Sequence, residues 1–363
     1  MWLIVFIVAI ALVVVGAVYM IGQISRFSAI NRIVEKNKLA GSILSSVIIA
    51  SVFLIICYTM SVVDGIVVFL STLMFFLLFG IIGKVVKKYT GKDYKGNLWG
   101  LLAVITSVIY LGVSFYLCNN VWETTYNIHT DKAIGKLKIA MFADSHLGTT
   151  FDGDGFAEKM KTIEEQAPDV LLIAGDMVDD STKKVDIQKA CNALGKLKIK
   201  YGVWFSFGNH DEGYYNGRDF TGQELREILK SNGVHVLEDE CSLIDDRFYI
   251  VGRLDKGYDS RKSIDELITG LDTDKYIIVI DHQPNDYANE AATAADLVVS
   301  GHTHGGQLIP ITYLGEWFGV NDMTYGYKKL NETNFIVTSG ISDWAIRFKS
   351  GTKSEYVIIN VEE

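Results

Sequence analysis

The hydrophobic pattern divides the chain into two parts. In the first part, four apolar stretches without a polar face occupy residues 1–22, 43–63, 66–83 and 98–118. A helix of about 20 apolar residues is long enough to cross the roughly 30 Å hydrocarbon core of a bilayer. We therefore predict that residues 1–118 form four transmembrane helices. The polar residues 119–136, with Trp122 and Tyr126, are expected to form an interfacial linker.

From Leu137 onward the pattern changes to short apolar runs, each followed by polar residues. Runs of four to seven residues rich in Val, Ile, Tyr and Phe are typical of buried strands. These runs are residues 137–143, 170–174, 203–207, 248–252, 276–280, 297–300, 335–339 and 355–361. Stretches with helical spacing lie between several of them, at 155–166, 183–195 and 222–231. Strands that alternate with helices predict a layered α/β domain over residues 137–363.

Positive charge within the first part indicates the orientation of the predicted helices. Its nine basic residues lie in the loops 23–42 and 84–97, and the turn 61–65 has none. Short loops rich in Lys and Arg remain on the cytoplasmic side of a plasma membrane. We therefore expect a multi-pass protein whose N-terminus and whose residues after Cys118 are extracytoplasmic. If the basic loops bind anionic lipid headgroups, they lie on the same side.

The second part is acidic. With nine of the 34 basic and three of the 43 acidic residues in the first part, the remainder has 25 basic and 40 acidic residues. A domain that binds a nucleic-acid polymer needs a basic surface, so no such partner is expected. A phosphorylated small-molecule or lipid-linked substrate would have to be bound locally, by a metal or a few placed cations.

The four cysteines form no CxxC or CxxH pair. Cys57 and Cys118 lie in apolar runs, whereas Cys191 and Cys241 lie in the second part. The last two could form a disulfide in an extracytoplasmic domain or remain as free thiols, and their spacing does not decide between these alternatives.

Residues able to bind a metal follow five of the predicted strands. Five of the seven histidines in the chain belong to these groups. The groups are Asp144-Ser145-His146, Gly175-Asp176-Met177-Val178-Asp179, Gly208-Asn209-His210-Asp211, Asp281-His282 and Gly301-His302-Thr303-His304. Because active sites of open α/β sheets lie at the carboxyl ends of strands, we expect the five groups to converge.

Carboxylate, imidazole and amide ligands without thiolate suit Mn²⁺, Fe, Zn²⁺ or Mg²⁺. Two such ions about 3.5–4 Å apart can bind the attacking and leaving oxygens of a phosphoryl group together. Each motif alone is common, but five in order, each at a strand end, predict a phosphoesterase centre with two divalent metal ions.

The ordered motifs D-x-H, G-D-x-x-D, G-N-H-D, H and G-H-x-H, from Asp144 to His304, resemble the signature of the calcineurin-like metallophosphoesterase superfamily. The segments GHTHGGQ (301–307) and SGISDWAIRF (339–348) are similar to its membrane-associated bacterial phosphodiesterase branch. This resemblance covers residues 137–363 and implies a four-layer α/β/β/α sandwich.

The resemblance also implies roles for individual residues. One metal would be bound by Asp144, His146, Asp176 and His304, and the other by Asp176 as a bridge, Asn209, His282 and His302. His210 would stabilise the transition state or protonate the leaving oxygen, and Asp179 would orient it. The reaction would be in-line attack on phosphorus by a metal-bridging hydroxide. Arg347 and Asp211 are expected near the substrate phosphate.

Three functions remain open. The first is hydrolysis of phosphodiester or pyrophosphate bonds, with a membrane- or envelope-derived substrate favoured by the predicted membrane helices. The second is a phosphomonoesterase or nucleotide phosphodiesterase. The third is a non-catalytic metal-dependent membrane sensor, although such a protein would have little need of His210 and Asp179. The aromatic residues around 313–327 could form a wall for an apolar substrate or pack in the core.

Overall fold

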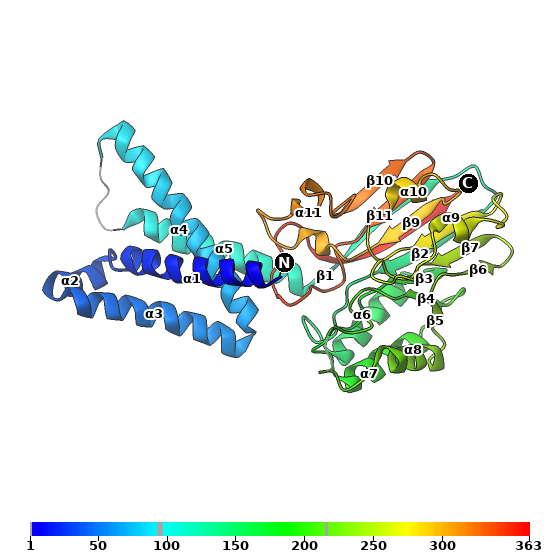
Figure 1. Ribbon diagram of the computed structural model, residues 1–363, viewed down its shortest axis with the longest axis horizontal. Helices are drawn as coiled ribbons and strands as arrows, with labels where there is room; N and C mark the ends of the chain where they lie inside the picture. Colours follow the sequence, from blue (N-terminus) through cyan, green and yellow to red (C-terminus); the bar gives the residue numbers. More distant parts are fainter. Residues whose placement is uncertain (1, 93–96, 215–216) are drawn as a thin grey trace. The chain divides into compact units, whose positions relative to one another are not determined.

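The computed structural model describes residues 2–92, 97–214 and 217–363, and the side chains of residues 2–10 are not included in that description. The chain forms two compact units, Met1–Phe115 and Tyr116–Glu363. Figure 1 shows the helices of the first unit and the sheets of the second.

The first unit is helical. Its helices are α1 (Trp2–Ile24), α2 (Ser28–Lys36), α3 (Lys38–Thr59), α4 (Val62–Thr90) and α5 (Leu98–Asn119), whose last turn belongs to the second unit. Among the described residues α3, α4 and α5 are long and apolar enough to cross a membrane, and there are up to four spans if the bent pair Ala11–Ile24 and Ser28–Lys36 is one span. The two parts of this pair meet at 92°.

The second unit contains two six-stranded mixed sheets. The first sheet has the order β1-β12-β2-β3-β4-β5, and the second has the order β10-β11-β9-β8-β7-β6. The strands of the first sheet are β1 (Val121–His129), β12 (Ser354–Glu362), β2 (Leu137–Phe142), β3 (Val170–Ala174), β4 (Val203–Ser206) and β5 (His235–Leu237). Those of the second are β10 (Gly326–Leu330), β11 (Thr333–Val337), β9 (Leu297–Ser300), β8 (Tyr276–Ile280), β7 (Phe248–Gly252) and β6 (Glu240–Ile244).

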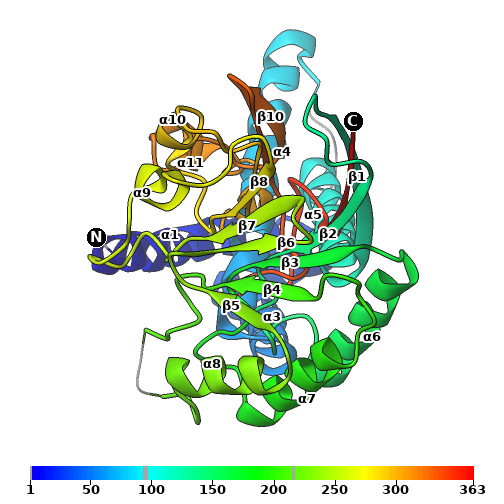
Figure 2. The same cartoon turned by 90° about the vertical axis from the view of Figure 1, so that its right-hand side faces the viewer.

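Helices cover the outer faces of both sheets. On the first sheet they are α6 (Gly153–Glu165), α7 (Lys184–Gly195) and α8 (Gly222–Ser231), and on the second α9 (Ile264–Ile268) and α10 (Tyr287–Glu290). The sequence specifies where two of them begin, because Thr221 and Glu224 form a capping box at α8, and Ser263 and Glu266 form one at α9. Figure 2 shows α7 and α8 on one side of the strands and α9 and α10 on the other.

Alternation along single strands creates three separate cores. In β2, Ile139 and Met141 face the second sheet, whereas Ala140 and Phe142 pack with α6, α7 and α8. Because successive side chains of a strand point to opposite faces, one apolar strand serves two cores. The predicted four-layer α/β/β/α sandwich is confirmed.

Two expectations differ from the structure. Residues 121–129, expected within a linker, form β1, which pairs in parallel with β12 over nine residues. The sequence also did not predict β5, β6 and β10, which are edge strands and carry exposed polar side chains. All four cysteines are free, with Cys191 buried on α7 and Cys241 exposed on β6.

Candidate metal centre

The predicted metal ligands are brought together by strands of both sheets. Asp144 and His146 follow β2, Asp176 follows β3, and Asn209 follows β4, all in the first sheet. His282 follows β8 and the pair 302 and 304 follows β9, in the second sheet. Their side chains therefore meet where the carboxyl ends of the two central sheets face each other.

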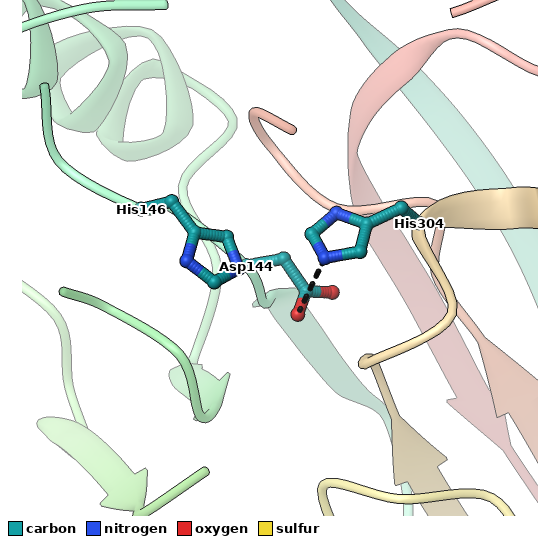
Figure 3. Close-up of side chains that lie close together, drawn as sticks. All are labelled: Asp144, His146 and His304. Atoms are coloured by element: carbon teal, nitrogen blue, oxygen red, sulfur yellow. Dashed lines mark ion pairs between the residues drawn. The ribbon is translucent and has the colours of Figure 1, made fainter. Parts of the chain in front are cut away.

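One group consists of Asp144, His146 and His304, each of which offers a ligand atom within 4.8 Å of the others. Figure 3 shows both imidazoles beside the carboxylate, with His304 Nε2 at 3.9 Å from Asp144 Oδ1. All three side chains are buried. The backbone N–H of His302 donates to both Asp144 oxygens, at 3.1 and 3.0 Å, and so orients this carboxylate.

The second group consists of Asp176, His282 and His302. Asn209 joins it, because its Oδ1 lies 3.1 Å from His282 Nε2 and 2.9 Å from His302 Nδ1. His282 Nδ1 donates to the carbonyl of Ala174 at 2.7 Å, which directs Nε2 toward the group. The Asp176 and Asn209 oxygens thus converge on the same side of His282, as they would around a cation.

Asp176 lies between the two groups. Its Oδ2 is 3.1 Å from His282 Nε2 and 3.7 Å from His146 Nε2. This is the position that a bridging carboxylate needs. The structure thus brings the seven predicted ligands together, and their binding of metal stays a prediction.

The protonation states suit cation binding. Burial lowers the pKa of His146 to about 3 and that of His302 to about 4, and it lowers the pKa of His304 well below its usual value. Neutral imidazole is the form that coordinates metals. Burial opposes a charge on His282 as well, but the neighbouring Asp176 carboxylate raises its pKa well above the usual value. In the absence of a metal, His282 is therefore protonated, and its positive charge faces the Asp176 carboxylate.

Two further observations test whether this donor set fits metal ions. Both ring nitrogens of His146 and Nδ1 of His304 are buried and have no hydrogen-bond partner among the described residues. Buried polar atoms in proteins are normally satisfied, and metal ions would satisfy those that point into the centre. The donor set therefore fits divalent metal ions, which the two groups would hold with Asp176 between them.

The backbone at the centre is strained. The φ angles of Asp144, His146, Asp176, His302 and His304 lie between 36° and 71°, in the left-handed region. Non-glycine residues rarely adopt this region, and such strain concentrates at functional sites.

Glycine 208 permits a close approach beside this strained backbone. A Cβ at this position would lie 2.2 Å from Asp176 Oδ1. Glycine therefore lets the loop after β4 reach the bridging carboxylate.

His210 lies beside the candidate ligands, with its ring centroid 5.0 Å from that of His146. Its Nδ1 is 3.7 Å from Asp179 Oδ1, and its backbone N–H donates to Asp176 Oδ1 at 2.8 Å. Two aromatic rings that the sequence motifs did not indicate flank it, with centroids 4.9 Å (Tyr214) and 5.4 Å (Trp344) away. The predicted pairing of His210 with Asp179 is thus consistent with the geometry.

Asp211, which we expected near the substrate phosphate, has a different place. It is fully buried, and its oxygens accept from the backbone N–H groups of Asp176, Met177 and Gly208 at 2.8–2.9 Å. The carboxylate therefore connects the loops after β3 and β4. Arg347 is half-buried, and its carbonyl accepts from Asn119 Nδ2 at 3.3 Å. Its contact with substrate stays a prediction.

Sequence analysis missed Asp343 and Lys349. Asp343 Oδ1 lies 3.4 Å from His304 Nδ1 and accepts from Gln307 Nε2 at 2.7 Å. The ammonium of Lys349 is fully buried, donates to the carbonyls of Ser339 (2.5 Å) and Ser342 (3.0 Å), and lies 3.8 Å from Asp343 Oδ2. A carboxylate behind a metal-binding histidine fixes the ring orientation.

The sequence is similar to those of known metallophosphoesterases. Residues 137–306 match the family model described as calcineurin-like phosphoesterase. The chain is 30% identical over 236 residues to an uncharacterized metallophosphoesterase of Campylobacter jejuni, covering 62% of this chain and 59% of that protein. It is 33% identical over 195 residues to an uncharacterized metallophosphoesterase of Aquifex aeolicus, covering 52% of this chain and 71% of that protein.

A zebrafish relative is named as a transmembrane protein. The chain is 28% identical over 247 residues to a transmembrane protein with metallophosphoesterase domain from Danio rerio, covering 64% of this chain and 54% of that protein. Two solved structures are also similar. They are a Thermus thermophilus protein (TM-score 0.39, 10% identical, 57% of this chain and 89% of that chain) and a dimetal phosphatase from Danio rerio (TM-score 0.35, 10% identical, 55% and 86%).

The matched segment begins at β2 and ends just after His304, so it contains both groups of candidate ligands. The helices of the first unit, with three or four possible spans, and the transmembrane relative indicate membrane association. The chain spans less than two thirds of the length of the Campylobacter and zebrafish relatives. It belongs to the calcineurin-like metallophosphoesterase family.

Proposed function

We propose that this protein is a binuclear hydrolase of phosphodiester or pyrophosphate bonds that acts on a membrane- or envelope-derived substrate. The observation that supports it most strongly is the position of Asp176, whose Oδ2 lies within 3.7 Å of imidazoles from both ligand groups. Two divalent ions bound there would lower the pKa of a bound water and stabilise the charge that develops on the phosphoryl oxygens.

His210 supplies the proton in this proposal. Asp179 faces Nδ1 of the ring and holds its orientation, which leaves Nε2 to donate to the leaving oxygen. Tyr214 and Trp344 flank the imidazole and restrict both its movement and the access of water. Because the second part is acidic overall, a phosphate has no broad basic surface to bind, and we assign its binding to the metal centre itself.

The test uses the full chain in detergent micelles with Mn²⁺, assayed on bis-p-nitrophenyl phosphate and on p-nitrophenyl phosphate. We expect diester cleavage, and a decrease in kcat of about 10²- to 10⁴-fold for His210→Ala. His235→Ala is the matched control, because this histidine stacks on Trp204 at 4.1 Å and belongs to no candidate ligand group. Preference for the monoester would replace the diester proposal, and no turnover with metals bound would leave the sensor hypothesis.

Metal content tests the binuclear part separately. We expect two metal ions per chain in the parent protein. Asp176→Asn should decrease the metal bound at both positions, because both ligand groups share this residue. A stoichiometry of one ion in the active parent protein would contradict the proposal.

The extracytoplasmic location is the second part of the proposal. Lys87 and Lys88 lie in the last turn of α4, just before α5 leads into the second unit. Lys95, which also contributes to the basic loop, lies outside the described residues. Since α5 is the last possible span, a cytoplasmic loop at 84–97 puts the second unit outside, whether or not the bent first pair crosses the membrane.

A reporter fused to the C-terminus checks this orientation. An enzyme that is active only in the periplasm or outside the cell should be active in the fusion. A reporter that is active only in the cytoplasm should be silent, and the opposite pattern would overturn the assignment.

A further inference from the structure

A long apolar segment of the second unit has exposed side chains. Residues 309–320, IPITYLGEWFGV, have one charged residue, Glu316. The short helix α11 (Leu314–Trp317) lies within it and has no buried residue. Three of its apolar side chains are among the most exposed, at 72% for Trp317, 78% for Phe318 and 60% for Val320.

The segment is nevertheless ordered by specific contacts at its base. The Glu316 carboxylate accepts from the backbone N–H of Thr324 at 2.6 Å, which turns its only charge toward the domain. A Cβ at Gly306 would meet the carbonyl of Thr312 at 2.1 Å, so the segment lies tightly against the turn that carries His304. The fold therefore presents these apolar side chains outward from a fixed base.

Within the second unit, the base of the segment is connected to the last turn of α5, which is the last possible membrane span among the described residues. The backbone N–H of Ile309 donates to Ser350 Oγ at 2.9 Å, and that of Ser350 donates to Gln307 at 2.9 Å. The same stretch, residues 347–354, binds the end of α5 at two points. Arg347 accepts from Asn119 Nδ2 at 3.3 Å, and Ser354 Oγ donates to the carbonyl of Cys118 at 2.7 Å.

Aromatic residues at the end of α5 indicate where the edge of a bilayer lies. Tyr116 and Trp122 pack with ring centroids 5.9 Å apart on either side of the last helical residue. Tyr and Trp concentrate at the level of lipid headgroups. Figure 1 shows α11 at the end of the second unit from which β1 starts.

We propose that residues 309–320 insert into the headgroup and upper acyl region of the same bilayer that α5 crosses. An apolar, aromatic-rich surface with no basic residue gains free energy by burial among acyl chains. A soluble surface of this kind is unusual, and it marks an interaction site. The bilayer is the occupant because hydrogen bonds within the second unit connect the base of the segment to the last turn of α5, where that helix would leave the membrane.

Insertion of the segment also positions the metal centre relative to the bilayer. His304 and Gln307 directly precede the segment, so its insertion holds this rim of the metal centre at the lipid surface. The inference depends on α5 as a membrane span, and it does not require that the proposed hydrolase activity be correct.

The test measures contact of the segment with lipid in the full chain, reconstituted in phosphatidylcholine vesicles. In a background of Cys57→Ala and Cys241→Ser, single cysteines at Phe318→Cys or Val320→Cys are labelled with an environment-sensitive fluorophore. Cys118 and Cys191 remain unlabelled because they are buried. The matched control is Leu243→Cys, an exposed apolar position (44%) on β6, at the opposite edge of the second sheet from β10.

Two quenchers then separate the outcomes. Lipids with a nitroxide on the acyl chain should decrease the fluorescence at 318 and 320 and leave that at 243 unchanged, whereas iodide in water should do the reverse. Quenching at 318 and 320 by iodide alone would overturn the proposal, since the segment would then lie in water. Protection from both quenchers would also overturn it, because a protein partner or a second copy would then cover the segment. Unchanged thermal unfolding of the labelled variants shows that the fold is intact.

Discussion

Asp343 is a carboxylate behind the predicted ligand His304. It receives hydrogen bonds from Gln307 Nε2 and its neighbour's backbone N–H, so its position beside His304 Nδ1 is fixed. We expect Asp343→Asn to weaken metal binding at this group and to lower kcat/KM by about 10- to 100-fold, as is usual when the partner of a metal-binding histidine is lost. Metal analysis after dialysis, together with diester assays over a range of Mn²⁺ concentrations, measures both effects.

The control for this variant is Asp265→Asn, an exposed carboxylate in the first turn of α9. It should leave both quantities unchanged. Excess Mn²⁺ should restore part of the activity of Asp343→Asn, and a deficit that no metal concentration reduces would show that Asp343 acts in another way.

The contrast between His304 and Asp343 explains how much of the site the sequence could predict. Every predicted ligand follows a strand within a few residues, so a motif and its strand together fix the place of the side chain. Asp343 and Trp344 come from a loop close to the C-terminal strand, and Lys349 bonds to backbone carbonyls. Only the folded chain brings them to the centre. Asp211 was found but misassigned, because its motif does not reveal that backbone N–H groups surround it.

Cys191 offers a second test at the scale of single residues. Burial raises the pKa of its thiol to about 12, and the reactive thiolate is therefore scarce at neutral pH. At pH 8 and in the folded protein, iodoacetamide should modify the exposed Cys241 and leave Cys191 unmodified, as judged by mass spectrometry of the two peptides. Both should react after unfolding without a reductant. A peptide pair that appears only after reduction would instead reveal a disulfide.

Strand β1 gives a prediction at the scale of elements. It pairs with β12 over nine residues, and Ile128 is only 4% exposed within the core between the sheets. Truncation of a buried aliphatic side chain removes its transfer free energy and leaves a cavity, so Ile128→Ala should destabilise the second unit by about 2–5 kcal/mol. Thr125→Ala, at an exposed position of the same strand, should change stability by less than about 0.5 kcal/mol.

Resistance to proteolysis in urea measures both variants in the full chain. Equal stability of the two would mean that residues 121–129 act as the linker that the sequence first indicated.

The sequence pattern predicts some strands better than others. Those in the middle of each sheet are buried on both faces, as β3 and β8 are, and therefore appear as continuous apolar runs. An edge strand has polar residues on its outer side, and β1 and β10 alternate or expose most of their side chains. Partners such as β1 and β12 also lie at the two ends of the second unit in sequence, and no local pattern indicates that they pair.

At the scale of the whole molecule, each unit has its own core. The first unit packs Met20, Phe69, Leu73, Phe76 and Ala103 together, and the three cores of the second unit are formed by its own sheets and helices. The candidate ligands all belong to the second unit. Metal binding should therefore stabilise one unit and leave the other unchanged.

Removal of metal tests this separation. In the metal-free centre the backbone of the ligand loops is strained, and burial raises the pKa of Asp144 to about 7. Metal at about 100 times its Kd adds roughly 2.7 kcal/mol of stability per site. At about 2–4 °C per kcal/mol for a domain of this size, excess Mn²⁺ should raise the melting temperature of the second unit clearly above its value in EDTA.

Calorimetry of the full chain in lipid nanodiscs should show this shift in one transition and none in the transition of the membrane helices. Asp176→Asn, which removes the shared ligand, should abolish most of the shift. If both transitions moved together with metal, the two units would unfold as one, and the second unit could not be treated as an independently stable hydrolase domain.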